Sequence, residues 1–202
     1  MQDRKSYDRT YAIVDLGRIV ENLRLCKEKL RKGMAVCAVV KMDAYGHGIV
    51  EVAKAIEDEC AMFGVATVEE AIILRKAGIE GDEYRIMPSL FTLKQLKKLE
   101  ELGKKNNTNL AVHIALDTGM GRIGIQTEEK GALKIAEQIL ASPYIEVKGI
   151  FSHFASCDEQ DKSYARKQEQ RFKNYLEKLK ERGFTIPLCH IANSAGILED
   201  IG

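Results

Sequence analysis

Lys41 stands at the end of an apolar run, in the stretch VVKMDAYGHG that covers positions 39–48. If the valines before it remove water from its ammonium group, the pKa of that group falls, and the amine can act as a Schiff-base nucleophile or a general base. The two glycines allow a sharp turn with room for a ligand, and Tyr45 places a phenol four residues from the amine. The simpler alternative is a lysine that only extends into solvent from a strand end, as most lysines do.

Arg122 lies in a second stretch of interest, DTGMGRIG, at positions 117–124. A glycine-rich turn after a strand is weakly specific, and a plain tight turn is the simpler interpretation. A guanidinium held on a rigid turn nevertheless suits an anionic oxygen of a ligand, because its planar donors match such an oxygen. Arg122 is therefore a candidate ligand-binding residue.

His153 and Ser194 complete the set of candidate residues. His153 lies among apolar and small residues in FSHFAS, where a lone histidine is more often a satisfied core residue than a ligand or a base. Ser194, in ANSAG, falls at the expected N-terminus of a helix, where a hydroxyl and free backbone N–H groups could bind phosphate. An ordinary N-cap is an equally good interpretation of Ser194 alone.

The elements that must position these residues alternate between short strand-forming runs and longer amphipathic segments. That alternation is typical of βα units and a parallel sheet, in which reactive groups gather at the C-terminal ends of the strands. All the candidate residues lie at or soon after such ends. The expected strands cover residues 35–41, 62–67, 84–91, 109–117, 146–154 and 187–194, and residues 10–16 could form a seventh.

Three of the expected helices have recognisable ends. A shared apolar face, a capping box and a terminal glycine are the signals that define them. The first carries Ile19, Leu23, Cys26 and Leu30 on its apolar face and ends near Gly33. The second begins at the capping box of Thr92 and Gln95, and the third covers residues 163–182 and ends at Gly183.

Composition limits the class of protein. The chain has 202 residues, 45% of them hydrophobic and 30% charged, which is typical of one soluble globular domain. A net charge of +1 gives no reason to expect nucleic acid or an anionic membrane as a partner. The sequence has no apolar stretch near the roughly 18 residues of a membrane span and no signal-peptide core, so we expect a cytoplasmic protein. Five scattered cysteines without a CxxC pair indicate neither a disulfide framework nor a zinc site.

Taken together, the motifs resemble those of the alanine racemase family. The matching stretches are TYAIVDL, VVKMDAYGHG, DTGMGRIG, GIFSHFAS and HIANSAG, which occur in the family's order and span nearly the whole chain. The resemblance implies an α/β fold, namely a (β/α)8 TIM-type barrel that binds pyridoxal 5'-phosphate (PLP). In the family, a β-rich C-terminal domain follows this barrel. Residues 1–202 would then be the N-terminal, PLP-binding barrel domain.

The resemblance also implies a role for each candidate residue. Lys41 matches the lysine that forms the internal aldimine with PLP and acts as one of two bases that exchange the α-proton. Tyr45 and Ser194 match residues that hold the cofactor phosphate. Arg122 matches an arginine that contacts the phenolic oxygen of PLP and the substrate side of the pocket, and His153 would lie near the pyridine ring. The chemistry itself belongs to the cofactor.

The implied activity is that of a PLP-dependent isomerase, alanine racemase, which interconverts L- and D-alanine and supplies D-alanine for cell-wall peptidoglycan. The implied partners are a small amino acid substrate and, for the full-length family, a second copy of the chain in a homodimer. Alanine, serine and other small amino acids remain open as the substrate. We expect no metal, no nucleic acid and no membrane at the site.

Two departures from the family pattern bear on this activity. A (β/α)8 barrel has eight βα units and about 250 residues, and fewer strands are expected here. Compared with the family pattern, one strand and one helix are missing after AIILRKAGIEG. The chain also stops at Gly202, before the last barrel strand and the C-terminal domain of the family. The second catalytic base is lost with that missing part. The expected fold is therefore an incomplete barrel. The alternative function is a truncated PLP-binding remnant without racemase activity.

Overall fold

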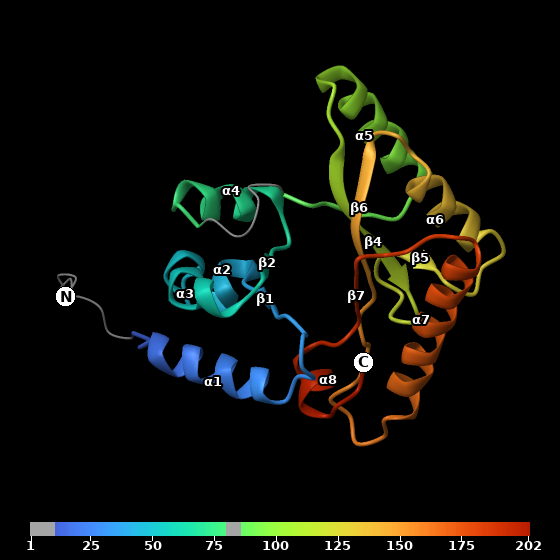
Figure 1. The fold of residues 1–202 in the computed structure, drawn as a ribbon. Helices are drawn as coiled ribbons and strands as arrows, with labels where there is room; N and C mark the ends of the chain where they lie inside the picture. Colours follow the sequence, from blue (N-terminus) through green and yellow to red (C-terminus); the bar gives the residue numbers. More distant parts are fainter. Residues whose placement is uncertain (1–10, 80–85) are drawn as a thin grey trace. The chain divides into compact units, whose positions relative to one another are not determined.

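The computed structural model of the chain describes residues 11–79 and 86–202 (Figure 1). These residues fall into two compact units, and the boundary lies between residues 84 and 85. We call the described residues 11–79 unit 1 and the described residues 86–202 unit 2, and each is described by itself. In these two ranges, no helix is long and apolar enough to cross a membrane.

Unit 1 contains a short parallel pair of strands and the helices that pack near it. Its strands run side by side, with Cys37 opposite Met62 and Val39 opposite Gly64. In chain order the elements are α1 (Leu16–Glu28), β1 (Cys37–Val39), α2 (Lys41–Gly46), α3 (Ile49–Ile56), the 3₁₀ helix η1 (Glu57–Glu59), β2 (Met62–Gly64) and α4 (Val68–Lys76). The strands expected over residues 35–41 and 62–67 are therefore confirmed in shortened form.

Lys41 opens a helix and does not close the strand, contrary to expectation. The N–H of Val40 still donates to the carbonyl of Gly64 at 2.9 Å, but the ψ of Val40 is 21°, outside the strand region. The carbonyl of Val40 then accepts from the N–H of Ala44 at 2.9 Å. The chain thus leaves the strand at Val40, and Lys41 is the first residue of α2.

The N-terminal segment forms a helix start where a seventh strand was considered. Residues 11–15 belong to no strand, and residue 10 lies outside the described residues. Asp15 is instead the N-cap of α1, because its carboxylate accepts from the N–H of Arg18 at 3.1 Å. α1 ends at Glu28, earlier than expected, and Leu30 N–H donates to the carbonyl of Lys27 in a tighter terminal turn.

The core of unit 1 forms around α3. Val52, Ala53 and Ile56 are buried on this helix. Val40, from the end of the strand, and Ile79, after α4, are buried in the same cluster. Burial of these apolar side chains fixes the segment that carries Lys41 to the rest of unit 1.

Unit 2 is built on a parallel sheet in the order β3-β4-β6-β7, with the short β5 paired to β4. Helices α5, α6 and α7 lie along one side of this sheet (Figure 1). In chain order the elements are β3 (Ser89–Leu90), α5 (Leu93–Asn106), β4 (Leu110–Asp117), β5 (Ile125–Gln126), α6 (Ala132–Leu140), β6 (Ile145–Phe151), α7 (Ser163–Glu181), β7 (Leu188–His190) and α8 (Ser194–Leu198).

Most of the local expectations for unit 2 are confirmed. Three of the four strands of the sheet lie within the expected runs, and β6 begins one residue before its run, at Ile145; residues 84 and 85 of the first run are outside the described residues. Thr92 and Gln95 form the expected capping box at the start of α5. α7 ends at Glu181, and Gly183 has the positive φ of +86° that a terminal glycine favours. β5 was not expected.

The two faces of the unit 2 sheet differ in chemistry. Successive residues of a strand point to opposite faces, so Val112, Ile114 and Leu116 share one face. These three side chains join the buried core together with residues of α6 and α7. His113 and Asp117, which alternate with them, share the other face. The sheet therefore has an apolar face packed on helices and a face that carries polar side chains.

The expected omission of a βα unit falls on the segment between α4 and β3. Residues 80–85 of that segment lie outside the described residues. In the part of the chain that the structure describes, β1 and β2 form one sheet and the remaining strands form another. The omission stays a prediction, and the α/β class with parallel strands is confirmed.

Candidate active site

Lys41 and Tyr45 lie close together in unit 1, as their spacing predicted. The Nζ atom of Lys41 is 5.9 Å from the centroid of the Tyr45 ring, within the range of a cation–π contact. Lys41 is half-buried, and Tyr45 is 59% exposed. Of the two valines expected to remove water from Lys41, Val40 is buried and Val39 is 50% exposed. The lysine is thus neither fully desolvated nor a free surface residue.

The turn that carries these two residues has an unusual backbone. Residues 42–45, none of them glycine, have φ between 51° and 56° and ψ between 38° and 50°, which is one turn of left-handed helix. For L-residues this conformation costs about 1–2 kcal/mol per residue. Gly46 and Gly48 follow with φ of +82° and +93°. The sharp turn expected at the glycines is confirmed, and the strained turn before them was not predicted.

Two carboxylates hold this left-handed turn. Asp43 accepts from the N–H of Ile49 at 2.8 Å. Glu70, from the first turn of α4, accepts from the N–H of Met42 at 2.7 Å and from the N–H of Ala66 at 2.8 Å. These backbone donors hold the pKa of Glu70 below its usual value, and the nearby charge of Lys41 acts in the same direction. Sequence analysis missed Glu70, although the spacing Thr67-x-x-Glu70 is that of a capping box.

The glycine-rich turn after β4 is rigid, as expected. The carboxylate of Asp117 accepts from the N–H of Gly119 at 2.9 Å and from the N–H of Gly121 at 3.1 Å. Both glycines have positive φ, of +130° and +72°. Arg122 lies exposed on this turn. The turn therefore supplies the rigid support that the sequence predicted, and the binding role of Arg122 stays a prediction.

A buried polar network ties the end of β4 to the end of β6. The hydroxyls of Thr118 and Ser152 are 2.8 Å apart. Gln168, on α7 and completely buried, donates to the hydroxyl of Thr118 at 3.2 Å and to the carbonyl of His153 at 3.1 Å. Because each of these buried groups is satisfied, the network fixes the backbone at His153. Sequence analysis did not identify this network.

His153 lies two residues beyond the end of β6 and is half-buried. Its neighbour Ser152 donates its N–H to the carbonyl of His190, the last residue of β7, at 3.0 Å. Burial lowers the pKa of His190 from 6.5 to about 4, and the charges of His113 and His153 add to the effect. His153 therefore belongs to a group of three histidines, with His113 in the middle of β4 and His190 at the end of β7.

The polar face of the sheet also carries an aromatic cluster. The rings of Phe151 and His190 stack with centroids 5.4 Å apart, and the ring of His113 lies 5.8 Å from that of His190. Among the described residues, the buried Nε2 atoms of His113 and His190 have no hydrogen-bond partner. Sequence analysis did not single out these two histidines. The alternation of His113 and Asp117 with apolar residues along β4 is the signal that could have placed His113 on the polar face.

Ser194 is the first residue of α8 and is exposed. The N-cap of this helix is Asn193, whose side chain accepts from the N–H of Gly196 at 2.9 Å. The alternative in which Ser194 is an ordinary N-cap is therefore wrong. The start of the helix at Ser194 is confirmed, and its hydroxyl is not used for capping.

The predicted residues fall into two groups. Arg122, His153 and Ser194 follow β4, β6 and β7, whose C-terminal ends lie at one edge of the sheet because the strands are parallel. Lys41 and Tyr45 form the other group, in unit 1.

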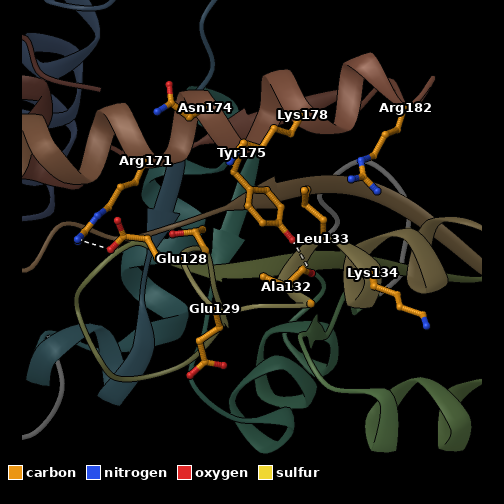
Figure 2. A pocket seen from close by; sticks show the side chains of 12 residues that line it. Glu128, Glu129, Ala132, Leu133, Lys134, Arg171, Asn174, Tyr175, Lys178 and Arg182 are labelled. Carbon is orange, nitrogen blue, oxygen red and sulfur yellow. Dashed lines mark hydrogen bonds and ion pairs between the residues drawn. The ribbon is translucent and has the colours of Figure 1, made fainter.

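A cavity of about 400 Å³ on unit 2 is separate from both groups, since none of the five predicted residues lines it. It lies between the start of α6 and one side of α7 (Figure 2). The hydroxyl of Tyr175 donates to the carbonyl of Ala132 across it at 2.9 Å. Arg171 is paired with Glu128, and Arg182 is paired with Glu137. Its arginines are thus already neutralised.

Residues 14–201 of the chain match the family described as the N-terminal domain of alanine racemase. The chain belongs to this family. It is 38% identical to the alanine racemase of Clostridium tetani (strain Massachusetts / E88), over 94% of this chain and 53% of that protein. It is 41% identical to alanine racemase 2 of Caldanaerobacter subterraneus subsp. tengcongensis, over 92% of this chain and 52% of that protein. The chain thus spans about half the length of these curated relatives.

Solved structures of alanine racemases have the same fold. The alanine racemase of Clostridium difficile 630 in complex with cycloserine matches with a TM-score of 0.85 at 33% identity, over 91% of this chain and 55% of that chain. The alanine racemase of Bacillus anthracis with bound L-Ala-P matches with a TM-score of 0.81 at 33% identity, over 92% and 52% of the two chains. The predicted α/β fold of the racemase N-terminal barrel domain is confirmed.

The side chains present have the chemistry that PLP requires. An amine, here Lys41, can bond to an aldehyde. The hydroxyls of Tyr45 and Ser194 can donate to phosphate oxygens, and the guanidinium of Arg122 can pair with an anionic ring oxygen. The unpartnered Nε2 atoms of His113 and His190 show that the polar face of unit 2 has hydrogen-bonding capacity that its own residues do not use. The donor set therefore fits the cofactor that the family resemblance implies.

Proposed function

We propose that residues 1–202 form the N-terminal, PLP-binding barrel domain of an alanine racemase, a cytoplasmic isomerase that interconverts L- and D-alanine for cell-wall peptidoglycan. The observation that carries the proposal is the position of Lys41. Its half-buried amine follows β1 on a rigid left-handed turn, beside the ring of Tyr45. Strained backbone directly after a lysine is typical of a functional position.

In this proposal, Lys41 holds the aldehyde end of the cofactor and moves a proton to or from the α-carbon of the substrate. PLP, when bound, supplies the electron sink that makes the α-proton removable. Tyr45 and Ser194 donate hydrogen bonds to the phosphate, and Arg122 pairs with the ring oxygen and faces the substrate. His153 contacts the ring. Each role needs a donor or a base, and each side chain supplies it.

Racemisation needs a base on each face of the substrate, since a proton must leave one face and arrive on the other. Lys41 serves one face in this proposal. We propose that the second base comes from sequence beyond residues 1–202 and from a second copy of the chain in a homodimer. This fits relatives of about twice the length. The alternative is a chain that binds PLP without racemase activity, and an experiment must distinguish it from the racemase domain proposed here.

The first experiment measures visible absorption of the purified chain after PLP is added and the excess removed. A band that depends on Lys41 is expected for the unaltered chain and should be absent from Lys41→Ala. Lys54→Ala is the matched control, because Lys54 is an exposed lysine on the neighbouring helix α3. If all three proteins give the same spectrum, the proposed role of Lys41 is wrong.

A second experiment separates the two functions. Racemase assays with L-alanine and L-serine are run on the 202-residue chain and on a chain extended to the length of the relatives. Activity in the longer chain alone places the missing base in the extension. Activity in neither chain, with PLP bound at Lys41, favours the alternative of a PLP-binding chain that does not racemise.

A further inference from the structure

The left-handed turn after Lys41 needs an external restraint. Residues 42–45 have positive φ without a glycine among them, so ordinary sterics favour other conformations for all four. Some of the restraint is local, because the N–H of Gly48 donates to the carbonyl of Asp43 at 2.9 Å. The N–H of Met42, next to Lys41, donates to no neighbour in the turn and binds Glu70 instead, at 2.7 Å.

Glu70 joins two segments that are far apart in the sequence. Its Oε1 atom accepts from Met42, and its Oε2 atom accepts from Ala66, which lies between β2 and α4. Each oxygen therefore holds one backbone N–H, and the carboxylate bridges the segments that follow the two parallel strands. Charge strengthens both bonds, because the acceptor is ionised.

We propose that Glu70 is a positioning residue for Lys41. The proposal rests on the proposed function of Lys41, and it states that the Glu70 carboxylate keeps residues 42–45 left-handed and thereby fixes the backbone from which the amine extends. The bonded atom, Met42 N, belongs to the residue next to Lys41. The geometry thus places the restraint one peptide bond from the lysine.

A simple capping role for Glu70 does not account for these contacts. Thr67 already caps α4, since its hydroxyl accepts from the N–H of Glu70 at 3.3 Å. Ala66 lies outside the helix, and Met42 is 28 residues away. A capping box would use the Glu70 side chain on the N-cap N–H of its own helix. The N–H of Thr67 also lowers the pKa of Glu70, but it does so less than the N–H groups of Ala66 and Met42, so the main contacts of the carboxylate lie outside its own helix.

The decisive experiment is amide hydrogen exchange of the chain without cofactor, followed by NMR. In Glu70→Gln one oxygen is replaced by an NH₂ group that cannot accept, so exchange at Met42, Ala66 or both should be about tenfold faster or more. Glu69→Gln is the matched control, because Glu69 lies in the same helical turn, is exposed and loses the same charge. Amides inside α3, in the core of unit 1, report whether the fold around Glu70 is intact. Unchanged exchange at both amides overturns the proposal.

A titration of the unaltered chain covers the case in which Glu70→Gln fails to fold. The amide proton signals of Met42 and Ala66 should move together as Glu70 is protonated, with a midpoint below the usual value for glutamate. Signals that do not move, or that move with different midpoints, overturn the shared restraint.

The link to the lysine is measured with PLP as the probe. Where the unaltered chain shows the Lys41-dependent band, Glu70→Gln should bind PLP about tenfold or more weakly, because a misplaced reactive group costs up to about 100-fold. Equal affinity together with faster exchange makes Glu70 merely structural and overturns the positioning role. If no chain shows the band but exchange rises at Met42, the proposed function fails while the restraint by Glu70 stands.

Discussion

The turn after β1 and the turn after β4 both contain backbone with positive φ, but different residues adopt it. After β4 the positions are glycines, and Asp117, only two and four residues away, holds Gly119 and Gly121. After β1 the positions are residues 42–45, none of them glycine, and Glu70 in another helix holds the turn together with the local carboxylate of Asp43. The first turn is encoded locally, and the second also depends on a long-range contact.

This difference teaches where each turn is vulnerable. A glycine turn fails when a side chain is added, because a residue with a Cβ atom is strained at the positive φ that glycine adopts freely. A left-handed turn of ordinary residues is strained from the outset, so it fails when its restraint is removed and improves when its strain is relieved.

The largest effect is expected for Gly124→Ala in unit 2. A Cβ atom at Gly124, where φ is +120°, would lie 2.5 Å from backbone atoms of Leu116 and Asp117. Neither backbone position can move without breaking the pairing of β4 with β5. We expect a loss of about 3 kcal/mol or more in the free energy of unfolding, measured with urea. Gly121→Ala, with open space around it, should cost only about 1 kcal/mol. Equal losses would refute the steric explanation.

An intermediate effect is expected from pH. The pKa of His190 in the folded chain is about 4 against 6.5 when unfolded, so the unfolded chain binds more protons between these values. Stability is therefore full above pH 6.5 and falls as the pH drops towards 4. We expect unit 2 to lose about 2–3 kcal/mol over this window from His190.

The control for this pH effect is the variant His190→Phe, which keeps an aromatic ring against Phe151 and should remove most of the slope. Glu70 acts in a lower window, because its pKa lies below the usual value and its contribution is lost only as the pH falls through that pKa. A slope that survives His190→Phe would show that another group is responsible.

The smallest effect is expected for Met42→Gly in unit 1. Met42 is 68% exposed and has φ of 54°, so glycine relieves strain and removes little packing. The free energy of unfolding should stay equal or rise, by at most about 1 kcal/mol. Ile72→Gly, on the exposed side of α4, should instead cost about 1 kcal/mol. If both variants lose the same stability, the turn is not strained.

Local signals in the sequence predicted much of this fold. The capping box at Thr92, the terminal Gly183 and the strand runs of unit 2 depend on neighbouring residues, and all are confirmed. The rigid turn from Asp117 was also predictable, because glycines mark the positions that need positive φ. The spacing of four residues likewise indicated that Lys41 and Tyr45 lie close together.

Features that depend on distant contacts were not predicted. β5 has only two residues, and its pairing with β4 defines it. The left-handed turn contains no glycine that would signal it, and its restraint by Glu70 spans 28 residues. The partnerless Nε2 atoms of His113 and His190 appear only when three strands lie side by side. Tertiary structure decided all three.

The most direct test of Lys41 as the cofactor lysine is to locate the attachment. The chain is incubated with PLP, reduced with borohydride and digested, and the modified lysines are identified and quantified by mass spectrometry. We expect one phosphopyridoxyl group per chain, at Lys41, with little at the exposed Lys54 on α3. Modification spread over surface lysines, with Lys41 no more modified than Lys54, would contradict the proposed role of Lys41.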